Sequence, residues 1–277
     1  MKETKVIFIT GASSGFGKET AEELVRRGHI VYGTSRKGAA CDNGVRMLPM
    51  DVTDKDSIAL AVDRVVAEQG RIDVLINNAG VGISGALELA TEEEIEKLEE
   101  EIEWQMGTNF KGMVNMCNAV LPHMRKARNG RIINISSIAG VMAVPFQGFY
   151  SASKFAIEGY SEALSMEVYP FGIKVCVVEP GDFSTNFTAN RNVSRETLAC
   201  DDYRECFERT MDIIEKEELG GSKPIKLAKR IARLVERRNP PFRTKVGPWF
   251  QVALAKVRWM VPQPWLAKGL RWFYKIK

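Results

Sequence analysis

Histidine is scarce in this sequence, and its cysteines are arranged neither for disulfides nor for metals. The chain contains only His29 and His123, which leaves few candidates for a catalyst built on histidine. Its five cysteines are an odd number, form no C-x-x-C pair and stand beside no histidine cluster. We therefore expect no disulfide framework and no metal site, and a cytoplasmic protein.

Long apolar runs are missing as well. No stretch approaches the roughly 20 apolar residues that a membrane-spanning helix needs, and the apolar part of the N-terminal MKETKVIFIT is too short for a signal peptide. With 45% hydrophobic and 27% charged residues, the composition is typical of a soluble globular protein. A chain of 277 residues can bury a sizeable core.

Acidic residues are absent from the end of the chain. Residues 237–277 hold ten lysines and arginines and no aspartate or glutamate, whereas residues 1–236 hold the other 29 basic residues and all 35 acidic ones. The net charge of +4 thus combines a mildly acidic body with a basic tail.

The basic tail is also rich in aromatic residues. Residues 248–277 contain four tryptophans among isolated cations, and Pro262 and Pro264 divide the segment into two short pieces. Aromatic rings beside lysine and arginine suit a membrane headgroup interface, which we favour as a peripheral contact on the inner face of a membrane. The alternative is a segment packed over a substrate cleft or a partner subunit. Nucleic acid fits poorly, since the basic residues are few and no element is suited to base recognition.

Short apolar runs alternate along the chain with amphipathic stretches of helical length. The predicted strands are residues 5–10, 29–35, 45–50, 71–80, 131–137 and 173–181, and the predicted helices are residues 19–28, 54–70, 91–110, 111–127 and 148–170. This alternation predicts an α/β protein with a single Rossmann-type, doubly wound parallel sheet and helices on both faces. We expect one domain over residues 1–246, an excursion at 182–221 over the substrate, and an amphipathic C-terminal tail at 247–277.

Small or polar residues follow each predicted strand. They are TGASSGFG, TSR, DV, NNAG, SS and PG, in chain order. In open parallel sheets, ligands bind outside the carboxyl ends of the strands. The pattern therefore predicts a ligand, and most simply a dinucleotide, along this edge.

The first of these stretches lies between a strand and a helix, as a dinucleotide loop requires. Glycines let the backbone approach a pyrophosphate, and the helix N-terminus offers unpaired N–H groups to it. The spacing is GxxxGxG rather than GxGxxG, and the alternative is an ordinary tight turn. The expected contacts to the cofactor in this loop are Gly11, Ser13, Ser14, Gly15, Phe16 and Gly17.

Arg36 follows the second predicted strand. Sites that prefer NAD place a carboxylate here for the ribose 2′-hydroxyl, whereas an arginine accommodates a 2′-phosphate. No aspartate or glutamate occurs between Glu23 and Asp42. Arg36 therefore favours NADP(H) as the cofactor, the alternative being an arginine that is merely solvated.

Tyr150 and Lys154 stand four residues apart in GFYSASKFAIEGY. Four residues are about one helical turn, so both side chains rise from one face. A neighbouring cation lowers the pKa of a tyrosine toward neutrality, where the phenol can exchange protons. Chance can also produce such a pair, so its meaning depends on the other motifs.

Taken together, these motifs resemble the short-chain dehydrogenase/reductase family over about residues 4–190. The resemblance rests on TGASSGFG, DV at 51–52, NNAG at 77–80, Asn109, Ser137, Tyr150-x-x-x-Lys154 and Pro180-Gly181. RIINISSIAGVMAVPFQGFYSASKFAIEGYSEAL and PFGIKVCVVEPGDFSTNF are similar to the branch that includes 17β-hydroxysteroid dehydrogenases. Related branches reduce retinoids and 3-ketosphinganine.

The resemblance implies four catalytic residues. Tyr150 would donate its proton to a carbonyl oxygen, and Lys154 would lower the Tyr150 pKa and hold the nicotinamide ribose. Ser137 would hydrogen-bond to the substrate oxygen, and Asn109 would anchor a water on the proton path. The stretch before Asn109 is about one helical turn longer than in the family, which either extends the helix outward or shifts Asn109 in register.

The resemblance also implies further contacts to the cofactor and a homo-oligomeric assembly. Asp51 and Val52 would meet the adenine, and Thr185 the carboxamide. The remaining residues expected to line the cofactor site are Asn77, Ala79, Gly80, Tyr150, Lys154, Pro180, Gly181 and Phe183.

Apolar residues near Tyr150 favour a lipid-like substrate over a sugar. They are Val141, Met142, Val144, Phe146 and Phe149. We therefore predict an NADP(H)-dependent oxidoreductase that interconverts a hydrophobic ketone, of hydroxysteroid or long-chain keto-lipid type, and its secondary alcohol. The alternative is a non-catalytic nucleotide-sensing protein of the same fold.

Overall fold

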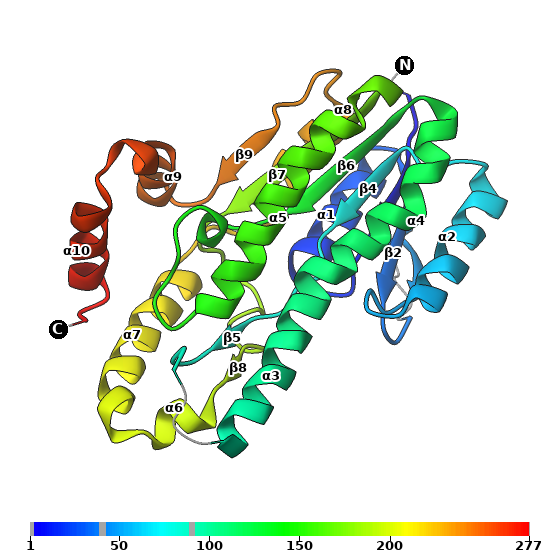
Figure 1. The fold of residues 1–277 in the computed structure, drawn as a ribbon. Helices are drawn as coiled ribbons and strands as arrows, with labels where there is room; N and C mark the ends of the chain where they lie inside the picture. The colour runs from blue at the N-terminus through cyan, green and yellow to red at the C-terminus, as the bar shows by residue number, and fades with distance from the viewer. Residues whose placement is uncertain (1–2, 39–42, 89–91, 277) are drawn as a thin grey trace.

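A seven-stranded sheet forms the centre of the molecule, and each neighbouring pair of its strands is parallel. The computed structural model describes residues 3–38, 43–88 and 92–276. The strand order β3-β2-β1-β4-β6-β7-β9 reverses direction between β1 and β4 (Figure 1). The strands are β1 (Val6–Ile9), β2 (Ile30–Ser35), β3 (Arg46–Pro49), β4 (Val74–Asn77), β6 (Gly130–Ile135), β7 (Ile173–Pro180) and β9 (Arg243–Val246).

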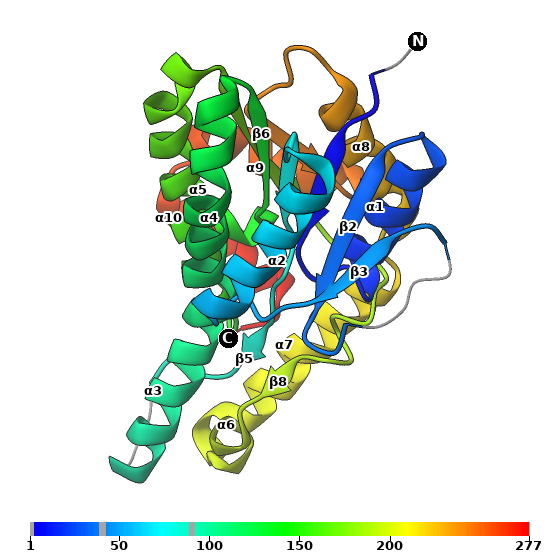
Figure 2. The same cartoon turned by 90° about the vertical axis from the view of Figure 1, so that its right-hand side faces the viewer.

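Helices cover both faces of the sheet, as the sequence predicts (Figure 2). On one face, α1 (Gly15–Arg26) packs against α8 (Pro224–Glu236), and Leu24 and Ile231 share a buried cluster with Ile7 of β1. The other face is covered by α2 (Lys55–Gln69), α4 (Gly112–Ala127) and α5 (Gly148–Glu167). The strands β1, β4 and β6 are buried along their whole length, which explains their continuous apolar sequences. The predicted doubly wound fold is confirmed.

The acidic helix α3 (Glu92–Met106) leads through a π-helical turn at Gly107–Lys111 into α4. Figure 1 shows α3 extending away from the sheet, so the additional length projects outward. A π-helical turn widens the helix by one residue and often occurs at functional positions. Asn109 lies within this turn.

The segment between β7 and α8 contains its own secondary structure. Its strand β8 (Asn192–Val193) pairs in parallel with β5 (Ile83–Ser84), and α6 (Arg195–Ala199) and α7 (Asp201–Leu219) follow. One side of α7 is buried through Phe207, Met211 and Ile214. Local sequence patterns predict no elements here, because charged residues dominate the segment and hide its narrow apolar stripe.

The tail forms two short helices, α9 (Trp249–Val257) and α10 (Gln263–Phe273), joined by a 3-10 turn at Arg258–Met260. Their inner sides pack on the segment after β6, where Ala255 and Leu266 share a buried cluster with Met142. Neither these helices nor any other in the described ranges has the length and apolarity to cross a bilayer.

Candidate active site

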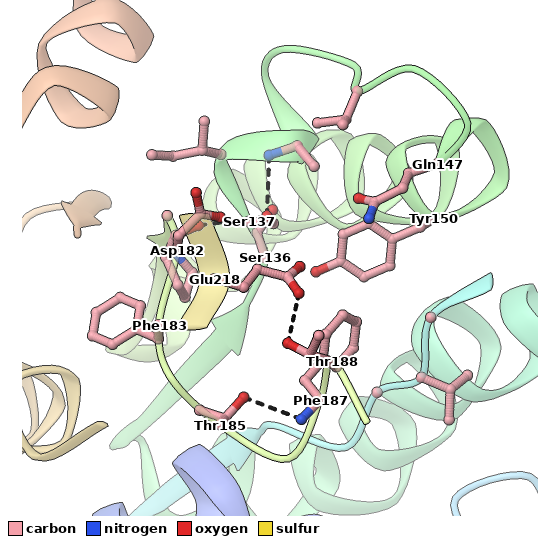
Figure 3. Close-up of a pocket in the computed structure, with 18 of the residues that line it drawn as sticks. Ser136, Ser137, Gln147, Tyr150, Asp182, Phe183, Thr185, Phe187, Thr188 and Glu218 are labelled. Atoms are coloured by element: carbon pink, nitrogen blue, oxygen red, sulfur yellow. Dashed lines mark hydrogen bonds between the residues drawn. The ribbon is translucent and has the colours of Figure 1, made fainter. Parts of the chain in front are cut away.

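A cavity of about 1160 Å³ runs along the carboxyl ends of the strands. Its lining includes residues that follow β1, β2, β3, β4, β6 and β7, which are the six strand ends that carry the sequence motifs. α7 and the tail helices supply further lining. Figure 3 shows the part around Tyr150. The predicted position of a ligand site at this edge is thus matched by a cavity of suitable size.

The glycine loop after β1 has the geometry of a phosphate cradle. Gly11 and Gly15 have φ of +66° and +52°, and an added Cβ at Gly11 would lie 3.0 Å from the Ala79 Cα. The Ser14 side chain makes no capping hydrogen bond, and the first backbone bond of α1 runs from the Lys18 N–H to the Ser14 carbonyl. The N–H groups of the first turn therefore have no helical partner, which fits a dinucleotide pyrophosphate.

Arg36 lies at the same end of the cavity as the glycine loop. The Ala12 N–H donates to the Thr34 carbonyl at 2.9 Å, which holds the loop beside the end of β2. Ser13, Ser14 and Arg36 all line the cavity, and the Arg36 side chain is exposed. A negatively charged group bound there would meet a guanidinium and two hydroxyls.

Tyr150 and Lys154 rise from the same side of α5; Lys154 is buried, whereas Tyr150 is partly exposed and lines the cavity. The Lys154 Nζ lies 5.6 Å from the centre of the Tyr150 ring and donates to the Ile135 carbonyl at 2.9 Å. Burial raises the pKa of Tyr150 to about 12 and lowers that of Lys154 to about 8. The predicted lowering of the Tyr150 pKa is not observed, because desolvation is the largest influence on this phenol and sets its pKa above the ordinary value.

Ser137 lies beside Tyr150 at the end of β6. Its hydroxyl caps the short turn at Ile138–Gly140 by accepting from the Ala139 N–H at 3.0 Å, and it donates to the Pro180 carbonyl at 3.4 Å. A hydrogen bond between the Ser137 and Tyr150 side chains acts to lower the Tyr150 pKa, against the larger effect of burial. Two hydroxyls thus meet in the cavity, where a carbonyl oxygen could contact both.

Asn109 lies behind this pair rather than in the cavity. Its Nδ2 donates to the Val81 carbonyl and to the Ser153 Oγ, each at 3.0 Å, and its Oδ1 accepts from the Val81 N–H at 2.8 Å. The side chain is 1% exposed. Because both amide hydrogens are used, Asn109 ties the segment after β4 to α5, and no side-chain donor is left for a water.

Most residues predicted for the cofactor site line the cavity. Three do not: Gly17 packs on the Gly11 carbonyl, Lys154 lies below the surface, and Asn77 donates to the Asn134 Oδ1 at 2.9 Å inside the sheet. The residues that do line it are Gly11, Ser13, Ser14, Gly15, Phe16, Arg36, Asp51, Val52, Ala79, Gly80, Tyr150, Pro180, Gly181, Phe183 and Thr185.

Several lining residues are absent from the sequence predictions. Asn78 donates through its Nδ2 to the carbonyls of Thr10 and Gly11, which joins the glycine loop to the end of β4. It stands inside the NNAG motif, so the motif itself could have indicated it. Gln147 and Glu218 also line the cavity, but no sequence pattern marks either of them.

The tail helices close one side of the cavity. Leu254, Leu266 and Leu270 line it from α9 and α10. Gln251 fastens α9 to the end of β7: its Oε1 accepts from the Asp182 N–H at 2.9 Å, and its Nε2 donates to the Asp182 carboxylate. The inner side of the tail therefore packs over the cleft, which is the alternative to a membrane contact that the sequence left open.

The chain is similar in sequence to known proteins over most of its length. The family model described as short chain dehydrogenase matches residues 5–196. A 3-ketodihydrosphingosine reductase of Bacteroides thetaiotaomicron is 60% identical over 275 residues, 99% of this chain and 100% of that protein. Human 17-beta-hydroxysteroid dehydrogenase type 1 is 36% identical over 198 residues, 66% of this chain and 58% of that protein.

A solved structure agrees with the sequence relatives. The crystal structure of a short-chain dehydrogenase from Streptomyces avermitilis superimposes with a TM-score of 0.80 at 33% identity, covering 96% of this chain and 97% of that chain. The similarity thus extends beyond the matched residues 5–196 into the C-terminal part of the chain.

Proposed function

The chain belongs to the short-chain dehydrogenase family, and from that premise we propose that it reduces a long-chain keto lipid with NADPH. It is an oxidoreductase of this family's type, acting between ketone and alcohol groups. The substrate that we propose is 3-ketodihydrosphingosine or a close analogue, an 18-carbon 2-amino-1-hydroxy-3-ketone. The full-length similarity to the Bacteroides reductase supports this class, as does the apolar side of the cavity.

The observation that carries the proposal is the meeting of the Tyr150 and Ser137 hydroxyls in a cavity that begins at a glycine phosphate loop. In the proposed reaction, the Tyr150 O–H bond breaks and its proton passes to the carbonyl oxygen, while Ser137 donates a hydrogen bond to the same oxygen. A bound nicotinamide would supply the hydride to the carbonyl carbon. The product is the secondary alcohol.

The electrostatics of Tyr150 suit a proton donor. A phenol whose pKa is about 12 remains protonated at neutral pH, so it is ready to donate in the direction of reduction. Proton transfer leaves a phenolate near the Lys154 ammonium, whose charge favours that product. Asn109 keeps α5 and the segment after β4 in register behind the reacting groups.

For the cofactor, we propose NADP(H) rather than NAD(H). Arg36, Ser13 and Ser14 line the part of the cavity beside the glycine loop, where the ribose of a dinucleotide would lie. The guanidinium would neutralise a 2′-phosphate, and the hydroxyls would donate hydrogen bonds to it.

We further propose that the outer side of the tail contacts an anionic membrane surface, where such a substrate dissolves. Trp249, Trp259, Trp265 and Trp272 are each at least 72% exposed, and Trp265 and Trp272 also line the cavity. Lysine and arginine stand among them without any acidic residue. Rings of this kind with cations are favoured at headgroups of negative charge. The protein would then be cytoplasmic and peripheral.

The assembly and the division of the chain also remain proposals. We propose a homo-oligomer, as in the related enzymes that the sequence resembles, and a dinucleotide-binding domain over residues 1–246 that carries the tail at 247–277. The excursion at 182–221 would serve as the substrate lid, since α7 lines the cavity opposite α5.

The test of the function is direct. The purified protein is incubated with 3-ketodihydrosphingosine and either NADPH or NADH, and the lipid is analysed by mass spectrometry. We expect the amino diol and a faster reaction with NADPH. Failure to form the alcohol with either nicotinamide would contradict the proposal.

A further inference from the structure

Glu218 is a carboxylate beside the proposed proton donor that the reaction as described does not use. It comes from the last turn of α7 and lines the cavity near Tyr150 (Figure 3). The Thr188 hydroxyl donates to its Oε2 at 2.6 Å, and the Arg191 guanidinium pairs with its Oε1. The side chain is 12% exposed. Its charge acts on the Tyr150 pKa, which shows that the two groups are close enough to interact.

This part of the cavity has an excess of negative charge. Asp182, Glu217 and Glu218 line it, and among the described residues the ion pair found for these carboxylates is that of Arg191 with Glu218. The pKa of Asp182 is raised to about 6, chiefly by burial and in addition by Glu218 and Glu217, against the opposite effects of a hydrogen bond from Gln251 and the charge of Arg191. Carboxylates with too few counter-charges favour a cationic ligand.

Gln147 provides an independent sign of a polar ligand. It precedes α5, is 7% exposed, and lines the cavity with its amide directed toward Tyr150 (Figure 3). Within the described residues its side chain makes no hydrogen bond, and its amide atoms are not sealed from solvent. They face the cavity, where a ligand can supply the missing partners. A bound substrate with a donor or acceptor next to the carbonyl would satisfy the amide.

We propose that Glu218 and Gln147 form a polar subsite that selects ketones with an ammonium on the carbon next to the carbonyl and a hydroxyl on the carbon after it. Glu218 would bind the ammonium, and Gln147 would hydrogen-bond to the hydroxyl, while Tyr150 and Ser137 hold the carbonyl oxygen. The alkyl chain would lie along the apolar lining from Leu254, Leu266 and Leu270. This inference rests on the proposed function, because it specifies which ketones that reaction accepts.

The contacts of Glu218 leave room for a further ligand on its carboxylate. Arg191 and Thr188 use only part of the hydrogen-bonding capacity of the Glu218 carboxylate, since each of its oxygens accepts more than one bond. Arg191 also lies 5.8 Å over the Phe187 ring, and that ring is 5.6 Å from Tyr150. Arg191 thus contacts both Glu218 and the ring that packs against Tyr150.

The experiment compares three ketones of equal chain length. They are a long-chain 2-amino-1-hydroxy-3-ketone, its N-acetyl derivative, which lacks the positive charge, and the plain 3-ketone. We expect the wild type to prefer the amino ketone in kcat/KM, and Glu218→Gln to lose about 10- to 100-fold on that substrate alone. Gln147→Leu should lower kcat/KM for both hydroxylated ketones and spare the plain one. Glu215→Gln, an exposed residue on the same helix, is the matched control.

The outcomes distinguish failure of the subsite proposal from failure of the proposed function. Equal losses on all three ketones would assign Glu218 a purely structural role and overturn the proposal, as would a wild type without preference for the amine. If the wild type reduced no ketone at all, the proposed function would fail. Calorimetric titration with the long-chain 2-amino alcohol would then test the subsite by itself. If the subsite exists, Glu218→Gln should bind this alcohol more weakly than the wild type, and equal binding would contradict it.

Discussion

The Lys154 Nζ lies 5.6 Å from the centre of the Tyr150 ring, but its hydrogen bond goes to the Ile135 carbonyl. Lys154 is thus held in place by the end of β6, with its ammonium over the face of the Tyr150 ring. Burial lowers its pKa to about 8, and the opposite effect of Glu158 only partly restores it. The charge state of this lysine therefore changes in a range that experiments can reach.

The first prediction concerns pH. Below about pH 8 the Lys154 ammonium is charged, and above it the amine is neutral, so we expect kcat/KM for reduction to fall as pH rises through about 8. The Tyr150 pKa of about 12 lies above that range and does not contribute. Lys154→Arg, which stays charged, should move the fall to higher pH. A profile that is the same in both proteins would refute the assignment.

The second prediction concerns the choice of cofactor. Arg36→Asp removes the cation that faces the end of the glycine loop and places a carboxylate there. NADPH binding should weaken by about 10- to 100-fold, as for loss of a charge-assisted hydrogen bond, whereas NADH binding should hold or improve. Cofactor fluorescence measures both affinities. Lys37→Asp, the exposed neighbour, controls for net charge; a similar loss in both variants would contradict the assignment.

The third prediction concerns the glycine loop. A Cβ at position 17 would lie 2.2 Å from the Gly11 carbonyl oxygen and 2.5 Å from the Asn78 Nδ2, so Gly17→Ala must displace the loop. We expect the free energy of unfolding to fall by about 1–3 kcal/mol and dinucleotide binding to weaken. Gly269→Ala, where nothing lies within 4 Å of the added methyl, is the control in a thermal denaturation assay. Unchanged cofactor affinity in Gly17→Ala would argue against this loop as the cradle.

The fourth prediction concerns the tail. Replacing the four exposed tryptophans of 249–272 by serine should reduce co-sedimentation with vesicles of phosphatidylcholine and phosphatidylglycerol, because the rings no longer enter the headgroup region. Vesicles of phosphatidylcholine alone should bind even the wild type weakly. A variant with Leu60 and Tyr169, both exposed on the body, changed to serine controls for loss of surface apolarity. Equal sedimentation of all three proteins would exclude tail-mediated contact.

Much of the fold follows from local sequence patterns. The six predicted strands match β1, β2, β3, β4, β6 and β7. All but the edge strand β3, in which only Leu48 is buried, are apolar runs that the sheet buries over most of their length. The edge strand β9 is not predictable in this way, since its sequence RTKV is half charged. Its Lys245 and Arg243 pair with the fully buried Glu179 and with Glu158, a match that only the tertiary structure reveals.

The candidate site also combines residues that the sequence predicts with features that only the folded structure reveals. Residues near the strand ends are indicated by motifs, because chain order alone brings those ends to one edge of the sheet. The pKa of Tyr150 could not be predicted, because it depends on the desolvation of the phenol in the folded chain. Glu218 could not be predicted either, since it comes from a helix in which charged residues are common and only its position over the cavity sets it apart.

The most direct test of the account measures NADPH consumption with 3-ketodihydrosphingosine in the wild type and in Tyr150→Phe. Loss of a general acid is expected to lower kcat by about 10²- to 10⁴-fold, with cofactor affinity preserved because the glycine loop and Arg36 are unchanged. Tyr160→Phe, a tyrosine of the same helix that does not line the cavity, serves as the control. Equal rates in Tyr150→Phe and the wild type would contradict the assignment of Tyr150 as the proton donor.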